Sequence, residues 1–62
     1  MAAKYQPGDA IRFPWTGGRI TYVITAVDEQ AQTVTFALPF DLEDCTTETF
    51  ADLDAVDVEV SR

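Results

Sequence analysis

The sequence predicts a small all-β domain of five strands, with one short helical turn before the last strand. Its 62 residues leave room for a single domain, residues 1–62, and the 47% of apolar residues is ordinary for a globular protein. Proline, glycine and polar clusters divide the chain into segments of strand length. The clearest segments are rich in β-branched residues or alternate apolar and polar side chains, which is typical of strands.

The first predicted strand covers residues 9–13, and it places Ile11 and Phe13 on one face. Residues 14–18, which read Pro-Trp-Thr-Gly-Gly, follow as a loop. Proline has no N–H for a strand ladder, and glycine adopts positive φ without strain, so this composition favours a turn.

The next two strands, residues 19–27 and 32–40, form a predicted hairpin with a turn at 28–31. Both faces of the 19–27 strand carry apolar side chains, which indicates a central or strongly bent strand. The 32–40 strand alternates strictly, with Pro39 on its outer face near the strand end. Its predicted inward residues are Val34, Phe36, Leu38 and Phe40.

The last third of the chain is more polar. Residues 41–45 are expected to form a turn, and residues 46–50 a weak strand rich in threonine. Residues 51–55 suit a single 3-10 turn. Residues 56–60 alternate valine with acidic residues, so we expect a closing strand with one buried face.

Both ends of the chain carry short motifs that fit this pattern. Residues 5–13, which read Tyr-Gln-Pro-Gly-Asp-Ala-Ile-Arg-Phe, look like the Gly-Asp opening of many SH3-like small β-barrels. Residues 50–58, which read Phe-Ala-Asp-Leu-Asp-Ala-Val-Asp-Val, are similar to their closure. The resemblance implies a five-stranded SH3-like small barrel with a short 3-10 turn before the last strand.

Two groups within this superfamily differ from the chain at their functional positions. The small barrels of photosystem I and of the photosynthetic NADH-dehydrogenase-like complex end in a similar way, but they help dock ferredoxin through a basic surface. Here the barrel region carries only Arg12 and Arg19 as bases. Domains that bind proline-rich peptides carry an Ala-Leu-Tyr-Asp-Tyr signature, which this sequence lacks. The resemblance therefore implies a fold and transfers no function.

The charge is strongly acidic and unevenly placed. The net charge is −7, and residues 41–62 hold eight of the eleven acids but one of the four bases. This excess of negative charge disfavours direct contact with nucleic acid and with anionic membranes. It could attract a basic protein, or it could serve solubility alone. The acidic surface comprises Asp41, Glu43, Asp44, Glu48, Asp52, Asp54, Asp57 and Glu59.

The sequence offers no recognisable catalytic group. It contains no histidine, so a histidine-assisted nucleophile is excluded, and acidic neighbours disfavour a thiolate at Cys45. The acidic spacings match no calcium loop, and the glycines form no phosphate-binding motif. We therefore expect no enzyme activity, no catalytic residue, no cofactor and no metal site.

The best candidate for a binding site is aromatic. Trp15, the only tryptophan, lies in the predicted loop beside Pro14 and near Arg19. Tryptophan and arginine are enriched among the residues that dominate interface energies. Phe40 would extend this patch if the loops converge. Alternatively, Trp15 plugs one end of the barrel as a core residue.

These features favour a non-enzymatic interaction or accessory module that docks on a protein partner. One alternative is an acidic inhibitor of phage or mobile-element type, whose carboxylates stand in for phosphates on a DNA- or RNA-binding protein. Another is a small subunit of a larger assembly. The start of the sequence has no apolar signal segment and its single cysteine cannot form an internal disulfide, so we expect a cytoplasmic protein. The sequence predicts no oligomeric state.

Overall fold

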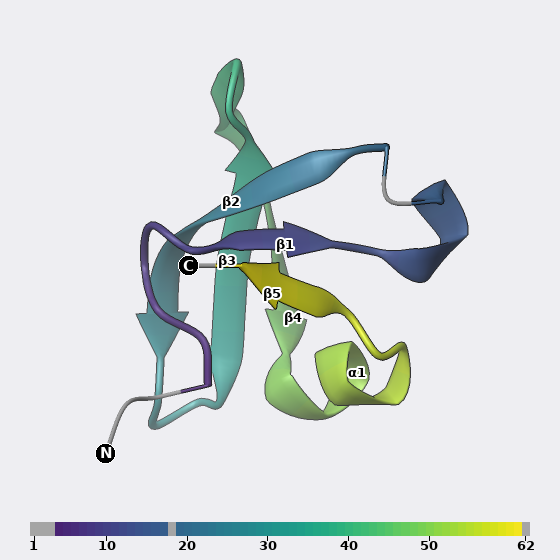
Figure 1. The fold of residues 1–62 in the computed structure, drawn as a ribbon. Coiled ribbons are helices and arrows are strands. Elements are labelled where there is room, and N and C mark those ends of the chain that lie inside the picture. The colour runs from purple at the N-terminus through teal and green to yellow at the C-terminus, as the bar shows by residue number, and fades with distance from the viewer. Residues whose placement is uncertain (1–3, 18, 62) are drawn as a thin grey trace.

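The computed structural model describes residues 4–17 and 19–61, without the side chain of Thr16. Five strands and two short helices follow one another along these residues (Figure 1). Their order is β1 (Ala10–Arg12), η1 (Pro14–Thr16), β2 (Thr21–Asp28), β3 (Thr33–Leu38), β4 (Asp41–Thr49), α1 (Phe50–Ala55) and β5 (Glu59–Ser61).

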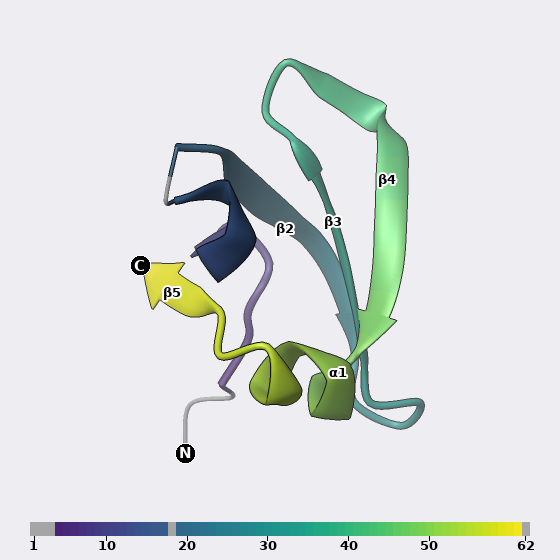
Figure 2. The same ribbon diagram turned by 90° about the vertical axis from the view of Figure 1, so that its right-hand side faces the viewer.

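The strands form one antiparallel sheet in the order β4-β3-β2-β1-β5, so the predicted all-β class and strand number are confirmed. The sheet bends strongly, and α1 lies across the open side between β4 and β5 (Figure 2). The sheet is not closed into a barrel, because β4 and β5 are its two edges and do not pair with each other.

A tight turn leads into β1. Pro7 and Gly8 occupy its central positions, Gly8 has a φ of 93°, and the N–H of Asp9 donates to the carbonyl of Gln6 at 3.1 Å. Proline followed by a residue with positive φ is the pattern that a type II turn requires. The N–H of Gly8 also donates to the carbonyl of Ile24 at 2.8 Å, which ties the turn to β2.

The β2–β3 hairpin forms as predicted, with a shift in register that changes which residues face the core. The shift falls between Ile24 and Ala26 on β2. Ile24 is buried, whereas Ala26, two positions further on, is exposed and Val27 packs against the core instead. A strict alternation fails here because a bulge adds one residue and reverses the faces beyond it. β2 also pairs with both β1 and β3, which confirms its central place.

The expected turn at 41–45 is wrong, since these residues belong to the long strand β4. The turn is the two-residue link Pro39-Phe40, flanked by the paired residues Leu38 and Asp41. Because Phe40 lies in this tight turn instead of on the inner face of β3, it is 84% exposed. A second register shift, between Phe36 and Leu38, also places Ala37 in a buried position that strict alternation assigned to the outside.

The helical turn before β5 is an α-helix of six residues, α1, and not the expected 3-10 turn. Thr49 caps it, because its hydroxyl accepts a hydrogen bond from the N–H of Asp52 at 3.1 Å. The 3-10 turn occurs instead at η1, inside the predicted loop. No helix among the described residues is long and apolar enough to cross a membrane. β5 is also shorter than expected, because Asp57 adopts a left-handed φ of 57° that delays the strand.

The core lies in the concave side of the bent sheet, with α1 over part of it. Ile11, Ile24 and Val34 enter it from three strands, and Leu53 enters it from α1. Three aromatic rings pack edge to face or tilted at centroid distances of 5.4 Å, which gives this small core much of its apolar area. They are Phe13, Tyr22 and Phe36.

The burial of Phe36 leads to a first prediction. Replacing Phe36 by alanine removes a ring that is 5% exposed, so we expect the free energy of unfolding to fall by about 3–5 kcal/mol. A loss of that size can unfold so small a domain. Chemical denaturation followed by circular dichroism measures it.

The matched control is Phe40→Ala, which removes the same ring from an exposed position and is expected to change stability by less than about 0.5 kcal/mol. A loss below about 1 kcal/mol for Phe36→Ala would contradict this description of the core.

Candidate functional site

The turn η1 fixes the position of the only tryptophan. Pro14 opens it, where the absent N–H of proline costs no hydrogen bond. Gly17 closes it with a φ of 67°, and its N–H donates to the carbonyl of Pro14 at 3.1 Å. Glycine adopts this left-handed backbone without strain. The sequence Pro-Trp-Thr-Gly therefore presents Trp15 on a defined turn at the end of β1.

Trp15 is neither a plug of the core nor a free side chain. It stacks on Phe13, with the ring centroids 4.8 Å apart and the ring planes at 19°. Phe13 is buried, whereas Trp15 remains 68% exposed. The core thus supports one side of the indole while most of the residue faces outward. Such a rigid, half-supported ring loses little conformational entropy when a ligand covers it.

Trp15 borders an open groove of about 470 Å³ between η1, β4 and α1. Its aromatic residues are Phe13, Trp15, Tyr22 and Phe36. The α1 side adds Leu53, Ala55 and Val56, and the polar residues are Thr46, Glu48 and Asp52. An apolar floor with a few polar groups at its margin is the usual composition of a ligand site.

The groove is open because β4 is polar on the side that faces the core. Thr46 pairs with Phe36 and Glu48 pairs with Val34, and paired residues of an antiparallel sheet point to the same face. The inward positions of β4 therefore carry a hydroxyl and a carboxylate where a closed barrel needs apolar side chains. Thr46 is exposed and Glu48 is half-buried.

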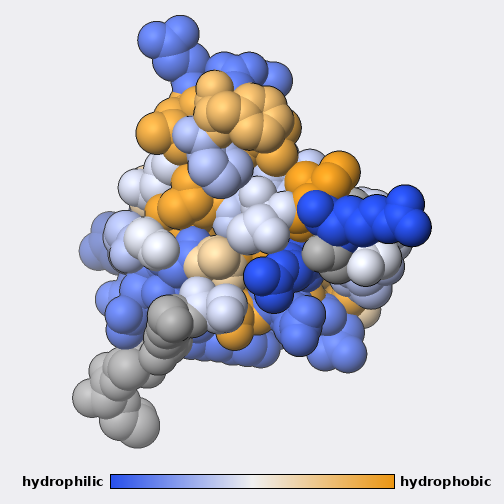
Figure 3. Space-filling view, turned by 45° about the horizontal axis from the view of Figure 1, so that its top comes forward, coloured by the Kyte–Doolittle hydropathy of each residue, from blue (hydrophilic) through white to orange (hydrophobic). Residues whose placement is uncertain are grey.

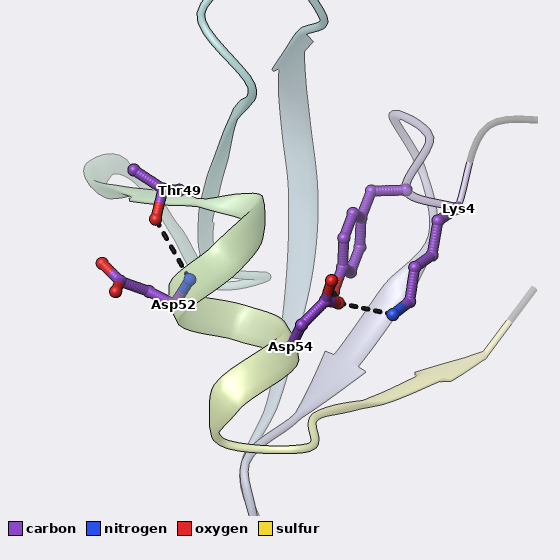
Figure 4. Close-up of polar contacts among 5 residues, drawn as sticks. Lys4, Thr49, Asp52 and Asp54 are labelled. Atoms are coloured by element: carbon purple, nitrogen blue, oxygen red, sulfur yellow. Dashed lines mark hydrogen bonds and ion pairs between the residues drawn. The ribbon is translucent and has the colours of Figure 1, made fainter.

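The N-terminal segment holds α1, which forms the far wall of the groove, in place. The hydroxyl of Tyr5 donates to the Asp54 carboxylate at 2.9 Å, and Lys4 forms an ion pair with the same oxygen (Figure 4). The Tyr5 ring also lies 5.4 Å from that of Phe50 at the start of the helix. These contacts join residues about fifty positions apart in the sequence.

The same contacts shift two ionisation equilibria. Burial, followed by the hydrogen bond to Asp54 and the charge of that carboxylate, raises the pKa of Tyr5 to about 12. The hydrogen bonds from Lys4 and Tyr5 hold the pKa of Asp54 below its usual value. Asp54 therefore stays ionised and Tyr5 stays neutral across the physiological range, which preserves the contact.

The structure does not bring the four predicted binding residues together. Trp15 alone among them lines the groove. Pro14 starts η1 and borders a neighbouring hollow that also contains Arg12, while Arg19 is exposed outside both. Phe40 lies in the turn between β3 and β4, and both it and Leu42 are exposed. Figure 3 shows hydrophobic surface at the upper end of the molecule, where this hairpin projects.

The predicted acidic surface also divides into separate groups. Glu48 and Asp52 line the groove, Asp54 binds Lys4 and Tyr5, and Asp57 and Glu59 border the hollow beside Arg12. The remaining three carboxylates are exposed along the first half of β4: Asp41, Glu43 and Asp44. Within residues 4–17 and 19–61, no three His, Cys, Asp or Glu side chains are grouped so as to hold a metal ion.

Comparison of the chain with models of protein families found no match, and comparisons with curated protein sequences and with solved structures found none either. The arrangement of the groove is therefore the basis for a functional proposal.

Sequence reasoning assigned the groove residues to separate classes. It placed Phe36 in the core, Trp15 in a loop and Glu48 in an acidic surface, and did not combine them. The signal that could have connected them is that residues 46 and 48, at alternate positions of the same strand, are both polar. These two residues pair with inward-facing residues of the apolar strand before them. A polar inner face on one strand indicates that the core beneath it stays uncovered.

The raised pKa of Tyr5 gives a prediction on stability at high pH. The unfolded chain loses the phenol proton near pH 10, whereas the folded chain retains it to about 12, so ionisation favours unfolding in that range. We expect the free energy of unfolding to decline between about pH 10 and 12, and Tyr5→Phe to reduce that decline. Urea denaturation at a series of pH values measures both.

Tyr22→Phe is the matched control, because it removes a phenol hydroxyl that does not contact Asp54. An alkaline decline that is equally steep in Tyr5→Phe and in the unaltered chain would show that the Tyr5–Asp54 bond is not its origin.

Proposed function

We propose that this chain is a non-enzymatic interaction module that docks on a protein partner through the groove beside Trp15. The observation that carries the proposal is the exposed indole, stacked on a buried ring at the edge of an open apolar groove. A fixed aromatic anchor beside a partly apolar pocket is what protein interfaces use at their energetic centres.

The groove also has the margin that a specific interface needs. Its floor is apolar, and its polar groups, Thr46, Glu48 and Asp52, lie on β4 and α1. Polar groups at the margin of a contact set the orientation of the partner, while the apolar centre supplies most of the affinity. The lack of histidine and of a recognisable nucleophile favours binding over catalysis.

We propose an SH3-like topology for the fold that carries this site. The strand order β4-β3-β2-β1-β5 and the helix directly before β5 support it. The free, exposed Cys45 accords with the reducing cytoplasm expected from the sequence.

The two alternatives predict different surfaces. An acidic inhibitor that imitates nucleic acid needs its carboxylates along one face, whereas here they lie in separate groups and Asp54 is neutralised by Lys4. A subunit of a larger assembly could use the apolar hairpin tip, with Phe40 and Leu42. Affinity capture with variants of the chain distinguishes both alternatives from docking at the groove.

The proposal predicts that partner capture depends on Trp15. In affinity capture from lysate of the source organism, we expect Trp15→Ala to lose the partner that the unaltered chain retains. Phe40→Ala is the matched control and is expected to keep it, because Phe40 is an exposed aromatic residue outside the groove. Circular dichroism verifies that both variants are folded, and mass spectrometry identifies the partner.

Capture is repeated at low and high salt to separate the alternatives. Docking on an apolar groove should survive added salt, since screening acts mainly on exposed charges. A nucleic-acid-binding protein that is lost at high salt but kept by Trp15→Ala would favour the acidic inhibitor. Loss with Phe40→Ala alone would favour an assembly contact at the hairpin tip. Either result would overturn the proposal.

A further inference from the structure

The groove beside Trp15 has a negative side as well as an aromatic one. Glu48 on β4 and Asp52 on α1 line it together with Phe13 and Trp15. Within residues 4–17 and 19–61, neither of these two carboxylates forms an ion pair, whereas Asp54 pairs with Lys4. Arg12 and Arg19 do not line the groove. Its charge therefore favours a cationic occupant.

The geometry of the aromatic rings favours a planar cation. Phe13 stacks on one face of the Trp15 indole, with the ring planes at 19°, so the indole offers a single flat face to a ligand and not the set of upright walls that encloses a round ammonium group. A guanidinium is planar, stacks on aromatic rings, and binds a carboxylate through two parallel N–H groups. Lysine carries a compact, strongly hydrated charge and lacks both properties.

The apolar floor suits the rest of such a side chain. Leu53 and Val56 line the α1 side of the groove, and Phe36 lines the sheet side. The three methylene groups of arginine can cover apolar surface while the guanidinium reaches a polar margin. Proline or leucine would cover the same floor but would leave the two carboxylates unpaired.

We propose that the groove binds an arginine side chain from an exposed segment of the partner protein. The guanidinium lies against Trp15 and pairs with Glu48, and its methylene stem covers the apolar floor. This inference rests on the proposed docking function and adds the chemistry of the residue that is recognised. The half-buried position of Glu48 makes its pairing less sensitive to salt than that of a fully exposed carboxylate.

The test uses the full chain and short peptides of defined charge. The probe is the capped pentapeptide Gly-Gly-Arg-Gly-Gly, compared with versions that carry citrulline, lysine or leucine at the centre. Citrulline keeps the shape of arginine and removes its charge. Because the chain has one tryptophan, the indole N–H of Trp15 gives a single assigned NMR signal that reports on the groove.

We expect the arginine peptide to shift this signal and to bind at least about fivefold more tightly than the citrulline and lysine peptides. Glu48→Gln should weaken arginine binding by about fivefold and leave citrulline binding unchanged, since it removes the charge and keeps the shape. Glu43→Gln is the matched control, because Glu43 lies on the same strand but outside the groove, and it should leave both affinities unchanged.

Several results would overturn the inference. If a variant fails to fold, the titrations of the unaltered chain with the four peptides still test it. Equal binding of arginine and citrulline would show that the groove recognises shape alone. Equal or tighter binding of the lysine peptide would show that the groove recognises a positive charge and not the planar guanidinium group. An equal loss of arginine affinity in Glu48→Gln and Glu43→Gln would show that the overall negative charge attracts the peptide, and not Glu48 in particular. If the arginine peptide does not shift the indole signal, arginine does not bind in the groove. The docking function itself fails only if capture of the partner is insensitive to Trp15→Ala.

Discussion

The polar inner face of β4 is the constraint on which the rest of the structure depends. Thr46 and Glu48 occupy positions that point toward the core, so β4 cannot cover the aromatic rings of its neighbouring strands. The sheet bends but stays open, and α1 covers only part of the exposed concave side. A threonine-rich, charged edge also has little tendency to pair with another chain, because such side chains oppose edge-to-edge association. One strand thus both exposes the groove and protects the sheet edge.

The N-terminal segment compensates for this open side. Tyr5 is almost fully buried, and its hydroxyl holds the end of α1 through Asp54, while Leu53 of the same helix enters the core. The helix has six residues, which is too short to be stable by itself, so it depends on these contacts and on the Thr49 cap. The far wall of the groove is therefore maintained by residues from the opposite end of the chain.

Periodicity and turn residues predicted the class of the fold, the number of strands and the β2–β3 hairpin. They failed for features that a local sequence pattern does not determine. The bulge after Ile24 and the register shift after Phe36 reverse the faces of two strands, and strict alternation cannot predict such shifts. Residues 41–45 looked like a turn because three of their five side chains are acidic, but an edge strand that is solvent-exposed on both faces can have the same composition. Trp15 was identified from its residue type, whereas its groove required the pairing of β4 with β3.

The pairing of β1 with β5 has a consequence for how the molecule folds. The strands β2, β3 and β4 are joined by short turns, whereas Ala10 must find Ser61 across nearly the whole chain. Contacts at such separation form late, because closing a long loop costs entropy before any contact compensates for it. The central three strands can therefore assemble first, and η1 and α1 reach their final places when the two end strands meet. A ligand of the groove consequently recognises the completed fold and shifts the folding equilibrium toward it by mass action.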